Sequence, residues 1–448
     1  MKLKIWAVLL TAVFLFTGCS YNQTGIDSLL KPPKLSDEQN KMYNALEAAL
    51  GSSAKGGIKL KYPRNGDFIS AFVKSNLDDE SSQEAIVFYE VANSATATMP
   101  LHINVLDQQN GEWVSTADIT TVAGASEVEK ISFITIQQKV YIVAGFNLTS
   151  TTDKVVVLYS YEEGMLREKF RISCNNYEVV DLDDNKESEI VAMTSKKSEG
   201  ENKTATAELW RITDTGNAFP LSTAVLDPNV TEYTKIIKGK LRDGRTALYL
   251  DGFRGTNLYT TEILTCQGQQ ILNLMYQGAD QENLISSTAR NYGASSTDLD
   301  GDGVVEIPVR IVAPGYESSE KHQQEYFTQW YVYENKGLTL SRTTYVAGTL
   351  GYIFTLPETW LGKVTVQYLS NESELTFYEY KEGGGWGEKL LSVKVVKYAN
   401  MQKEATEKGY AMLKDYGQIM YVYKIERAGM RMGITAGLVE RSFKIYKM

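Results

Sequence analysis

The sequence predicts a mainly β protein, a β-propeller of about five four-stranded blades followed by a small α+β C-terminal domain. Three observations carry this prediction: one hairpin pattern recurs at an even spacing, apolar runs of strand length fill the intervals, and aromatic residues are abundant. The 448 residues include 28 tyrosines but only 9 prolines, and 43% are hydrophobic. A chain of this length and composition can bury a large core divided over two or three domains.

The first residues, MKLKIWAVLLTAVFLFTGCS, indicate export. Lys2 and Lys4 precede an apolar run over 5–16, which has the length of a signal peptide and is too short for a permanent membrane span. The ending Phe16-Thr17-Gly18-Cys19 resembles the lipobox of bacterial lipoproteins, with Phe16 where leucine is usual. This resemblance implies a signal peptide over 1–18 and a diacylglyceryl group on Cys19 that anchors the protein to the outer face of the cell membrane. The alternative is an ordinary signal peptide with a coincidental cysteine.

Residues 19–66 predict a lipid-anchored tether followed by a short helix. The tether is polar and is interrupted by Pro32-Pro33. Ser36 and Gln39 have the spacing of a capping box, which predicts a helix from there to about Leu50.

From residue 67 to 346 one unit repeats: an apolar run, a polar turn with glycine, and a second apolar run. The five copies are INVLDQQNGEWV (103–114), VVVLYSYEEGML (155–166), AELWRITDTGNAF (207–219), TEILTCQGQQIL (261–272) and QWYVYENKGLTL (329–340). Their turn glycines are Gly111, Gly164, Gly216, Gly268 and Gly337, at steps of 53, 52, 52 and 69 residues. Two more strand-like runs precede each hairpin, so each unit of roughly 50 residues supplies the four strands of a propeller blade.

An acidic loop in the fifth repeat has the spacing of a calcium site. Carboxylates at positions 1, 3, 5 and 9 and a carbonyl at position 7 can converge on one hard cation, and Gly303 permits the bend. The expected ligands are Asp298, Asp300, Asp302, the carbonyl of Val304, and Glu306. The residues after the loop read as a strand, so the sequence predicts a strand-loop-strand site and not an EF-hand.

Two other repeats carry the same loop in the same register. The third repeat offers Asp181, Asp183, Asn185, the carbonyl of Glu187, and Glu189, with Lys186 in place of the glycine. The first repeat offers Asn76, Asp78, Glu80 and Glu84, with no glycine at all. We expect bound Ca²⁺ to be structural; the alternative is a solvated acidic turn without metal. Repeats two and four have short turns at 136–140 and 241–246 without such ligands.

This loop motif resembles that of the FG-GAP/VCBS repeats, as in the integrin α-subunit propeller and many bacterial surface proteins. Within this group the chain is similar to VCBS-repeat lipoproteins of Gram-positive, Clostridia-type bacteria. The similarity covers residues 19–345 and includes LLKPPKLSDEQ and KYPRNGDFISAF ahead of the first loop. It implies a calcium-binding β-propeller in the cell envelope, extracellular and membrane-anchored, and it implies no activity.

Residues 347–448 lose the repeat and predict a small α+β domain. A new unit is expected to begin at YIFTLPETW (352–360). Strands are expected at 363–368, 375–380, 390–396, 410–414 and 419–425, and helices at 401–408 and 436–441.

The sequence favours a non-catalytic scaffold that binds a protein or glycan. The net charge of −9 argues against nucleic acid as a partner. A five-bladed glycoside hydrolase would need paired carboxylates on the innermost strands. We expect those strands at 68–75, 130–135, 179–182, 234–240 and 289–295, with Glu178 and Glu232 only flanking them. That enzyme and a structural spacer presenting the C-terminal domain remain the alternatives.

Three cysteines and two histidines are too few for a disulfide framework or a zinc cluster. Cys174 and Cys266 lie in different repeats, as two buried thiols or as one long-range disulfide. His102 and His322 stand apart from any catalytic pattern.

Overall fold

The computed structural model describes residues 35–78, 80–91, 100–196, 203–255, 258–279, 283–291, 294–381 and 384–446. The expected signal peptide (1–18), the lipidation site Cys19 and the tether up to residue 34 lie outside the described residues. The described part is mainly β and contains six antiparallel sheets of four or five strands. Within these ranges, no helix combines the length and apolar character that crossing a bilayer requires.

The chain forms two compact units. Among the described residues, the first unit combines 35–61 with 70–76 and 80–120, and the second contains 62–69, 77–78 and the chain from Thr121 to Tyr446. The domain limits expected from the sequence, after residues 66 and 346, stay predictions.

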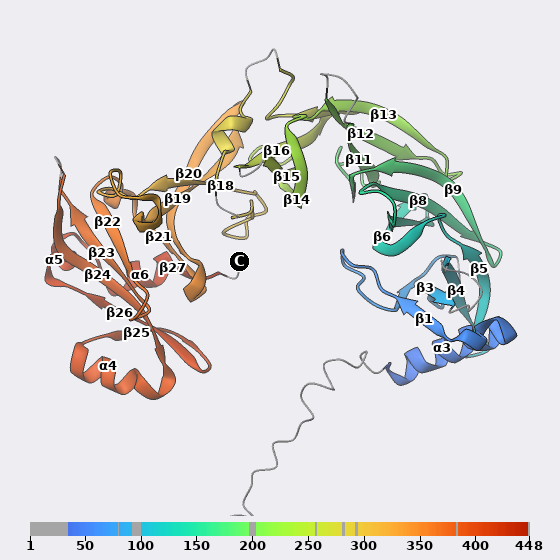
Figure 1. Cartoon of the computed structure of the whole chain (residues 1–448), viewed down its shortest axis with the longest axis horizontal. Helices are drawn as coiled ribbons and strands as arrows, with labels where there is room; N and C mark the ends of the chain where they lie inside the picture. Colours follow the sequence, from blue (N-terminus) through green and yellow to red (C-terminus); the bar gives the residue numbers. More distant parts are fainter. Residues whose placement is uncertain are drawn as a thin grey trace, which may run out of the picture. The chain divides into compact units, whose positions relative to one another are not determined.

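The first unit is a five-stranded sheet with helix α3 (Asp37–Leu50) against strands β4 and β5 (Figure 1). Its strands are β1 (Ile58–Lys61), β2 (Phe72–Ser75), β3 (Glu84–Val91), β4 (Leu101–Gln109) and β5 (Glu112–Thr120). The order is β1-β3-β4-β5, and β2 also pairs with β3. The predicted capping box is confirmed, because Ser36 Oγ accepts a hydrogen bond from Gln39 N and Gln39 Oε1 accepts one from Ser36 N. Met42 and Leu46 on α3 are buried.

Three four-stranded sheets follow, one for each of repeats two, three and four. Strands β6 (Ala125–Ile136), β7 (Lys139–Leu148), β8 (Lys154–Glu162) and β9 (Met165–Cys174) form the first of them. The next contains β10 (Asn176–Val180), β11 (Glu189–Lys196), β12 (Thr204–Ile212) and β13 (Ala218–Val225). The third contains β14 (Val230–Lys240), β15 (Thr246–Arg254), β16 (Leu258–Gln267) and β17 (Gln270–Asn273). In each sheet the strands lie in chain order, as four strands per repeat predict.

The predicted hairpins are confirmed, and all but that of the third repeat, which turns over residues 213–217, have two-residue turns. The turn between β4 and β5 holds Asn110 and Gly111 at φ values of 55° and 85°, the left-handed region that glycine adopts without strain. In the fifth repeat the left-handed residues are Asn335 and Lys336, at 52° and 62°, and Gly337 begins the next strand instead.

Consecutive sheets of the second unit share hydrophobic cores, each sheet with the next. Each core contains buried residues from two neighbouring sheets. Examples are Val156 and Ile190, Leu209 and Leu248, Ile263 and Ile307, and Phe327 and Phe377. Gly145 on β7 permits one of these contacts, because a Cβ there would lie 2.2 Å from the phenol oxygen of Tyr177 on β10. Four-stranded sheets stacked in chain order in this way are consistent with propeller blades.

The fifth sheet departs from the predicted pattern. Its order is β18-β19-β20-β21-β27, formed by β18 (Ile307–Val312), β19 (Tyr326–Glu334), β20 (Gly337–Ala347), β21 (Tyr352–Thr355) and β27 (Phe443–Ile445). The innermost strand expected at 289–295 is wrong: among the described residues there, Arg290 makes a single bridge, to Tyr259 on β16. The reason is a buried ion pair between Arg290 and Asp251 on β15, which ties this segment to the fourth sheet.

Two expectations about inner-strand carboxylates are also corrected. Glu178 lies within β10 and Glu232 within β14, and neither merely flanks its strand. Glu178 forms ion pairs with Lys130 on β6, at 2.8 Å, and with Lys238 on β14, at 3.1 Å. It therefore joins the first strands of three successive sheets.

The last hundred residues form a sixth sheet and also extend the fifth. Strands β21 and β27 add to the fifth sheet, so 352–355 pairs with β20 and does not start a separate sheet. The sixth sheet has the order β22-β23-β24-β26-β25, in β22 (Val364–Leu369), β23 (Glu374–Tyr380), β24 (Trp386–Lys397), β25 (Ala411–Tyr416) and β26 (Ile419–Ile425). The helices are α4 (Met401–Lys408), α5 (Arg427–Arg431) and α6 (Ala436–Ser442). The predicted strands and helices of this region are confirmed, with shifts of a few residues at their ends.

Candidate metal loops and ligand pocket

The acidic loop of the fifth repeat is folded by its own carboxylates. Asp298 accepts hydrogen bonds from the backbone nitrogens of Gly301, at 2.6 Å, and Gly303, at 2.8 Å. Glu306 accepts one from the backbone nitrogen of Leu299, at 2.8 Å. As a result, one oxygen each of Asp298, Asp300 and Glu306 lies within 4.8 Å of the other two. Three carboxylates at this separation suit a divalent cation such as Ca²⁺.

The loop of the third repeat shares most of these hydrogen bonds in the same register. Asp181 accepts from the backbone nitrogens of Asn185 and Lys186, and Glu189 accepts from that of Leu182. This loop holds the second triad, in which one oxygen each of Asp181, Asp183 and Glu189 again lies within 4.8 Å of the other two. Lys186 adopts a φ of 77° where Gly303 adopts 89°, so the loop forms without the glycine.

Among the described residues, Asp302 does not join its triad, and the predicted roles of Asn185 and of the Val304 and Glu187 carbonyls stay predictions. Asp302 and Asn185 accept hydrogen bonds from the backbone nitrogens of Val304 and Glu187, at 2.8 and 2.6 Å. In the first repeat, where Asp79 is not described, Asn76 donates to the carbonyl of Glu80 and Glu84 is buried. No triad forms there among the described residues, Asp78 included.

An arginine contacts each triad, and neither was predicted. Arg342 on β20 contacts Asp300, and its Nη2 lies 3.2 Å from Glu306 Oε1. Arg211 on β12 contacts Asp183 and lies 3.2 Å from Glu189 Oε1. The two arginines lie 42 and 28 residues from their aspartates and on different strands of their repeats, so the repeat pattern carries no signal for them.

Burial and the neighbouring arginine shift the pKa values of carboxyl groups in both loops. Burial raises the pKa of Glu189 to about 7, and the charge of Asp183 adds to this while Arg211 opposes it. Burial likewise raises the pKa of Glu306. Hydrogen bonding from Arg342 lowers the pKa of Asp300. A cation at either triad would offset the repulsion that burial makes costly.

Both loops also bind the neighbouring fourth sheet. Asp184 accepts hydrogen bonds from Thr246 N, at 3.1 Å, and Thr246 Oγ1, at 2.7 Å. The carbonyl of Gly303 accepts from Lys240 N at 2.8 Å. Gly239 permits this approach, because a Cβ there would lie 2.3 Å from Val305 Cγ2. The loops therefore fasten one repeat to the next.

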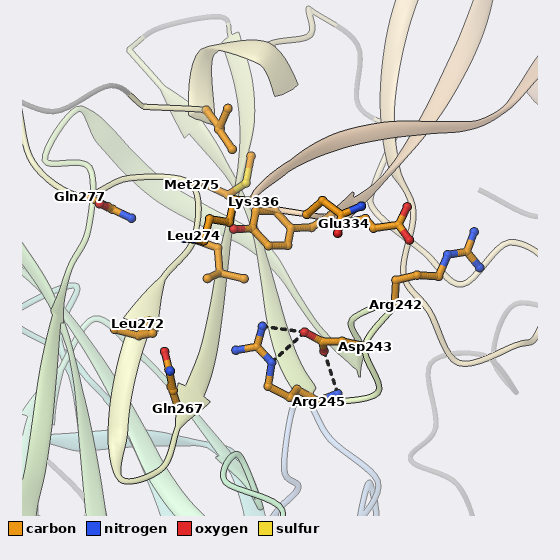
Figure 2. Close-up of a pocket in the computed structure, with 13 residues that line it drawn as sticks. Arg242, Asp243, Arg245, Gln267, Leu272, Leu274, Met275, Gln277, Glu334 and Lys336 are labelled. Carbon is orange, nitrogen blue, oxygen red and sulfur yellow. Dashed lines mark hydrogen bonds and ion pairs between the residues drawn. The ribbon is translucent and has the colours of Figure 1, made fainter.

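A pocket of about 710 Å³ opens where the fourth and fifth sheets meet (Figure 2). Its apolar lining comes mainly from the segment after β16, and its polar lining from the β14–β15 turn and the β19–β20 hairpin. The lining residues are Arg242, Asp243, Arg245, Gln267, Leu272, Leu274, Met275, Gln277, Leu284, Tyr333, Glu334, Asn335 and Lys336.

The charged edge of this pocket is partly fixed in place. Arg245 donates to Asp243 Oδ2 from Nε at 3.0 Å and from Nη2 at 2.8 Å, as the dashed lines in Figure 2 show. These hydrogen bonds lower the pKa of Asp243, so this carboxyl is poorly suited to act as a general acid. Lys336 on the opposite hairpin is exposed. The pocket thus offers an apolar floor and a preorganised polar rim, the usual features of a binding site.

A second pocket, of about 690 Å³, lies at the strand ends of repeats two to four. Its polar lining includes Asn175, whose Nδ2 donates to Asp153 at 2.8 Å, and Asn176. Glu232 and Tyr233 on β14 also line this pocket.

The cysteines and histidines have structural surroundings. Cys174 and Cys266 are buried free thiols, and burial raises the pKa of each to about 12. His102 stacks on Tyr89, with ring centres 5.1 Å apart, and His322 is exposed beside Glu320.

Comparisons with known proteins give no family. No protein-family model matches this chain, and no curated protein matches it. Among solved structures, it is similar to the exotype rhamnogalacturonan lyase YesX, with 13% identity, a TM-score of 0.31 and coverage of 75% of this chain and 72% of the lyase. It is also similar to a rhamnogalacturonan lyase from Bacillus licheniformis, with 12% identity, a TM-score of 0.30 and coverage of 74% and 75%. Likenesses this low carry no argument about what the chain does.

Proposed function

We propose that this chain is a non-catalytic, lipid-anchored protein of the cell envelope whose repeated sheets form a calcium-stabilised β-propeller that binds a protein or glycan. The N-terminal pattern ending at Cys19 supports export and anchoring at the outer face of the cell membrane. The sheets stacked in chain order support the propeller.

The observation that carries the binding role is the pocket between the fourth and fifth sheets. Leu274 and Tyr333 give it apolar surface, and the Asp243–Arg245 pair is held in place before any ligand arrives. Polar groups that are already ordered lose less entropy on binding, which favours recognition. The acidic loop of the fifth repeat lies beside the same turn, because Arg242 is 3.6 Å from Asp302.

Two acidic triads support Ca²⁺ as the structural ion. The Asp298, Asp300 and Glu306 carboxylates and those of Asp181, Asp183 and Glu189 would hold it. Asp183 Oδ1 is buried and has no hydrogen-bond partner in the part of the chain that the structure describes, and a bound cation would satisfy this oxygen. Bound Ca²⁺ would fix the two loops against the fourth sheet and thereby stabilise the fold.

The binding role is tested by crosslinking in intact cells and by glycan arrays, with a pocket variant and a matched control. The pocket variant is Leu274→Ala with Lys336→Glu. The control is Met165→Ala with Arg167→Glu, an exposed apolar residue and a cation on β9 outside both pockets. We expect the control to retain the captured partner and the pocket variant to lose it. Equal capture by both variants would rule out this pocket.

Anchoring is tested separately. Cys19→Ser should move the protein from the membrane fraction to the soluble fraction, because it removes the acyl attachment. Membrane retention of this variant would contradict the anchor.

A further inference from the structure

We propose that Arg211 and Arg342 are internal cations that close the acidic loops when no metal is bound, and that Ca²⁺ binds a loop only after its arginine has left. This inference rests on the calcium binding proposed above, and it adds how that binding is controlled. It makes each loop a switch between an arginine-closed and a calcium-bound state.

The first step is that the arginine and the proposed metal ion would use the same carboxylates. In both loops the guanidinium Nη2 contacts the aspartate at position 3 and the glutamate at position 9. These two residues, with the aspartate at position 1, are also the proposed metal ligands. Ca²⁺ needs carboxylate oxygens at about 2.3 to 2.6 Å, so it must occupy the space in front of the same carboxylates. Two cations cannot share that space, because their mutual repulsion is strong at such separations.

The second step is that the arrangement occurs twice from unrelated positions. Arg211 lies on β12, the first strand of its repeat's hairpin, whereas Arg342 lies on β20, the second strand of its repeat's hairpin. A conserved strand position therefore does not explain the two contacts. The feature common to both is a triad of negative charge that is partly buried and attracts a cation when metal is absent.

The third step is that arginine satisfies the third-repeat loop incompletely. Asp183 Oδ1 and Arg211 Nε are both buried and have no hydrogen-bond partner among the described residues. A planar guanidinium reaches two of the three carboxylates, whereas a spherical ion can accept an oxygen from each. The arginine therefore closes the loop but leaves buried polar atoms without hydrogen bonds, so that Ca²⁺ can replace it.

The two loops should respond to calcium in order. The Asp300 side chain is 37% exposed and Arg342 is 25% exposed, whereas Asp183 is 9% and Arg211 20% exposed. Because solvent weakens an exposed ion pair, the more exposed Arg342–Asp300 pair competes less strongly with a metal ion than the Arg211–Asp183 pair. We therefore expect Ca²⁺ to enter the fifth-repeat loop at lower concentration than the third-repeat loop.

The test is calcium affinity in arginine variants, measured by titration calorimetry of the whole protein. Arg342→Met and Arg211→Met remove the competing cations while keeping much of the side-chain volume. If the arginine-closed state is favoured about tenfold over the open state, each variant tightens the apparent Kd of its own loop about tenfold. Arg431→Met is the matched control, because Arg431 pairs with Glu388 at an exposed site away from both loops and should leave affinity unchanged.

A second variant covers the case in which a methionine variant does not fold. Arg342→Lys keeps the positive charge but loses the fork geometry, and it should tighten calcium binding by less than Arg342→Met. If the wild type binds calcium and the arginine variants bind it equally or more weakly, this inference is overturned while the calcium sites stand. No calcium binding by the wild type or by any arginine variant would overturn the calcium sites themselves.

Discussion

Replacing Arg290 by methionine tests whether a buried ion pair holds the extra segment of the fifth repeat to the fourth sheet. The side chains of Arg290 and Asp251 are each 1% exposed, and Arg290 Nη2 lies 2.8 Å from Asp251 Oδ1. Arg290 also donates to the carbonyls of Ala294 and Thr288 and to Thr261 Oγ1. The substitution removes all of these contacts and leaves a buried carboxylate without its cation.

The expected loss of unfolding free energy is about 3 kcal/mol. Removing one partner of a buried pair costs about 3 to 5 kcal/mol. Asp251 keeps three hydrogen bonds, from Thr261 Oγ1 at 2.6 Å, Ser296 N at 2.6 Å and Ser296 Oγ at 2.8 Å, which places the cost near the lower limit. The double variant Asp251→Asn with Arg290→Met should lie within about 1.5 kcal/mol of the wild type, because it leaves no buried charge.

The assay is urea unfolding, with the change in midpoint multiplied by the slope. Arg431→Met is the comparison, because its partner Glu388 is 65% exposed and such pairs contribute about 0 to 1 kcal/mol. A loss below about 1 kcal/mol in Arg290→Met, no larger than in Arg431→Met, would refute the reasoning. So would a double variant that is as unstable as the single one.

Three further predictions concern packing, pH and thiols. Gly239→Ala should lose about 1 to 3 kcal/mol in urea unfolding, because the new Cβ would clash with Val305, whereas Gly437→Ala on α6 should be neutral or stabilising; equal effects would contradict the packing. Burial raises the pKa of Glu262 to about 7, so the folded state holds a proton that the unfolded state releases near its ordinary value of about 4.5. Stability from this group is therefore full below about pH 4.5 and is lost as pH rises to about 7, and Glu262→Gln should flatten that slope in unfolding measurements; an unchanged slope would show that another group causes it. Both described cysteines should resist alkylation until the protein is unfolded, as mass spectrometry can measure, and rapid labelling of the native protein would contradict their burial.

The repeated sheets could be predicted because their signals are local. Turn residues such as Asn110 and Gly111 and the apolar runs beside them fix a hairpin within about a dozen residues. The triads could be predicted for the same reason, since Asp298 and Glu306 lie in one short loop whose backbone they hydrogen-bond. The hydrogen bond that Asp302 accepts from Val304 N, in place of joining the triad, could not be predicted. It depends on which backbone nitrogens of the folded loop need an acceptor.

The contacts that the sequence did not predict join residues far apart in the chain. Arg342 reaches Asp300 over 42 residues, and Arg290 reaches Asp251 from a segment that was expected to be a strand. Neither arginine belongs to the repeated sequence pattern, so only the folded sheets bring these charges together. The same holds for the pocket, whose two sides come from different repeats.

The most direct test of the calcium loops is a crystal structure of the protein grown with Ca²⁺. The account predicts an ion bound by Asp298, Asp300 and Glu306 at about 2.3 to 2.6 Å, with the Arg342 guanidinium displaced from both of its carboxylates. A guanidinium still bound to Asp300 and Glu306, with no ion in the loop at saturating calcium, would contradict it.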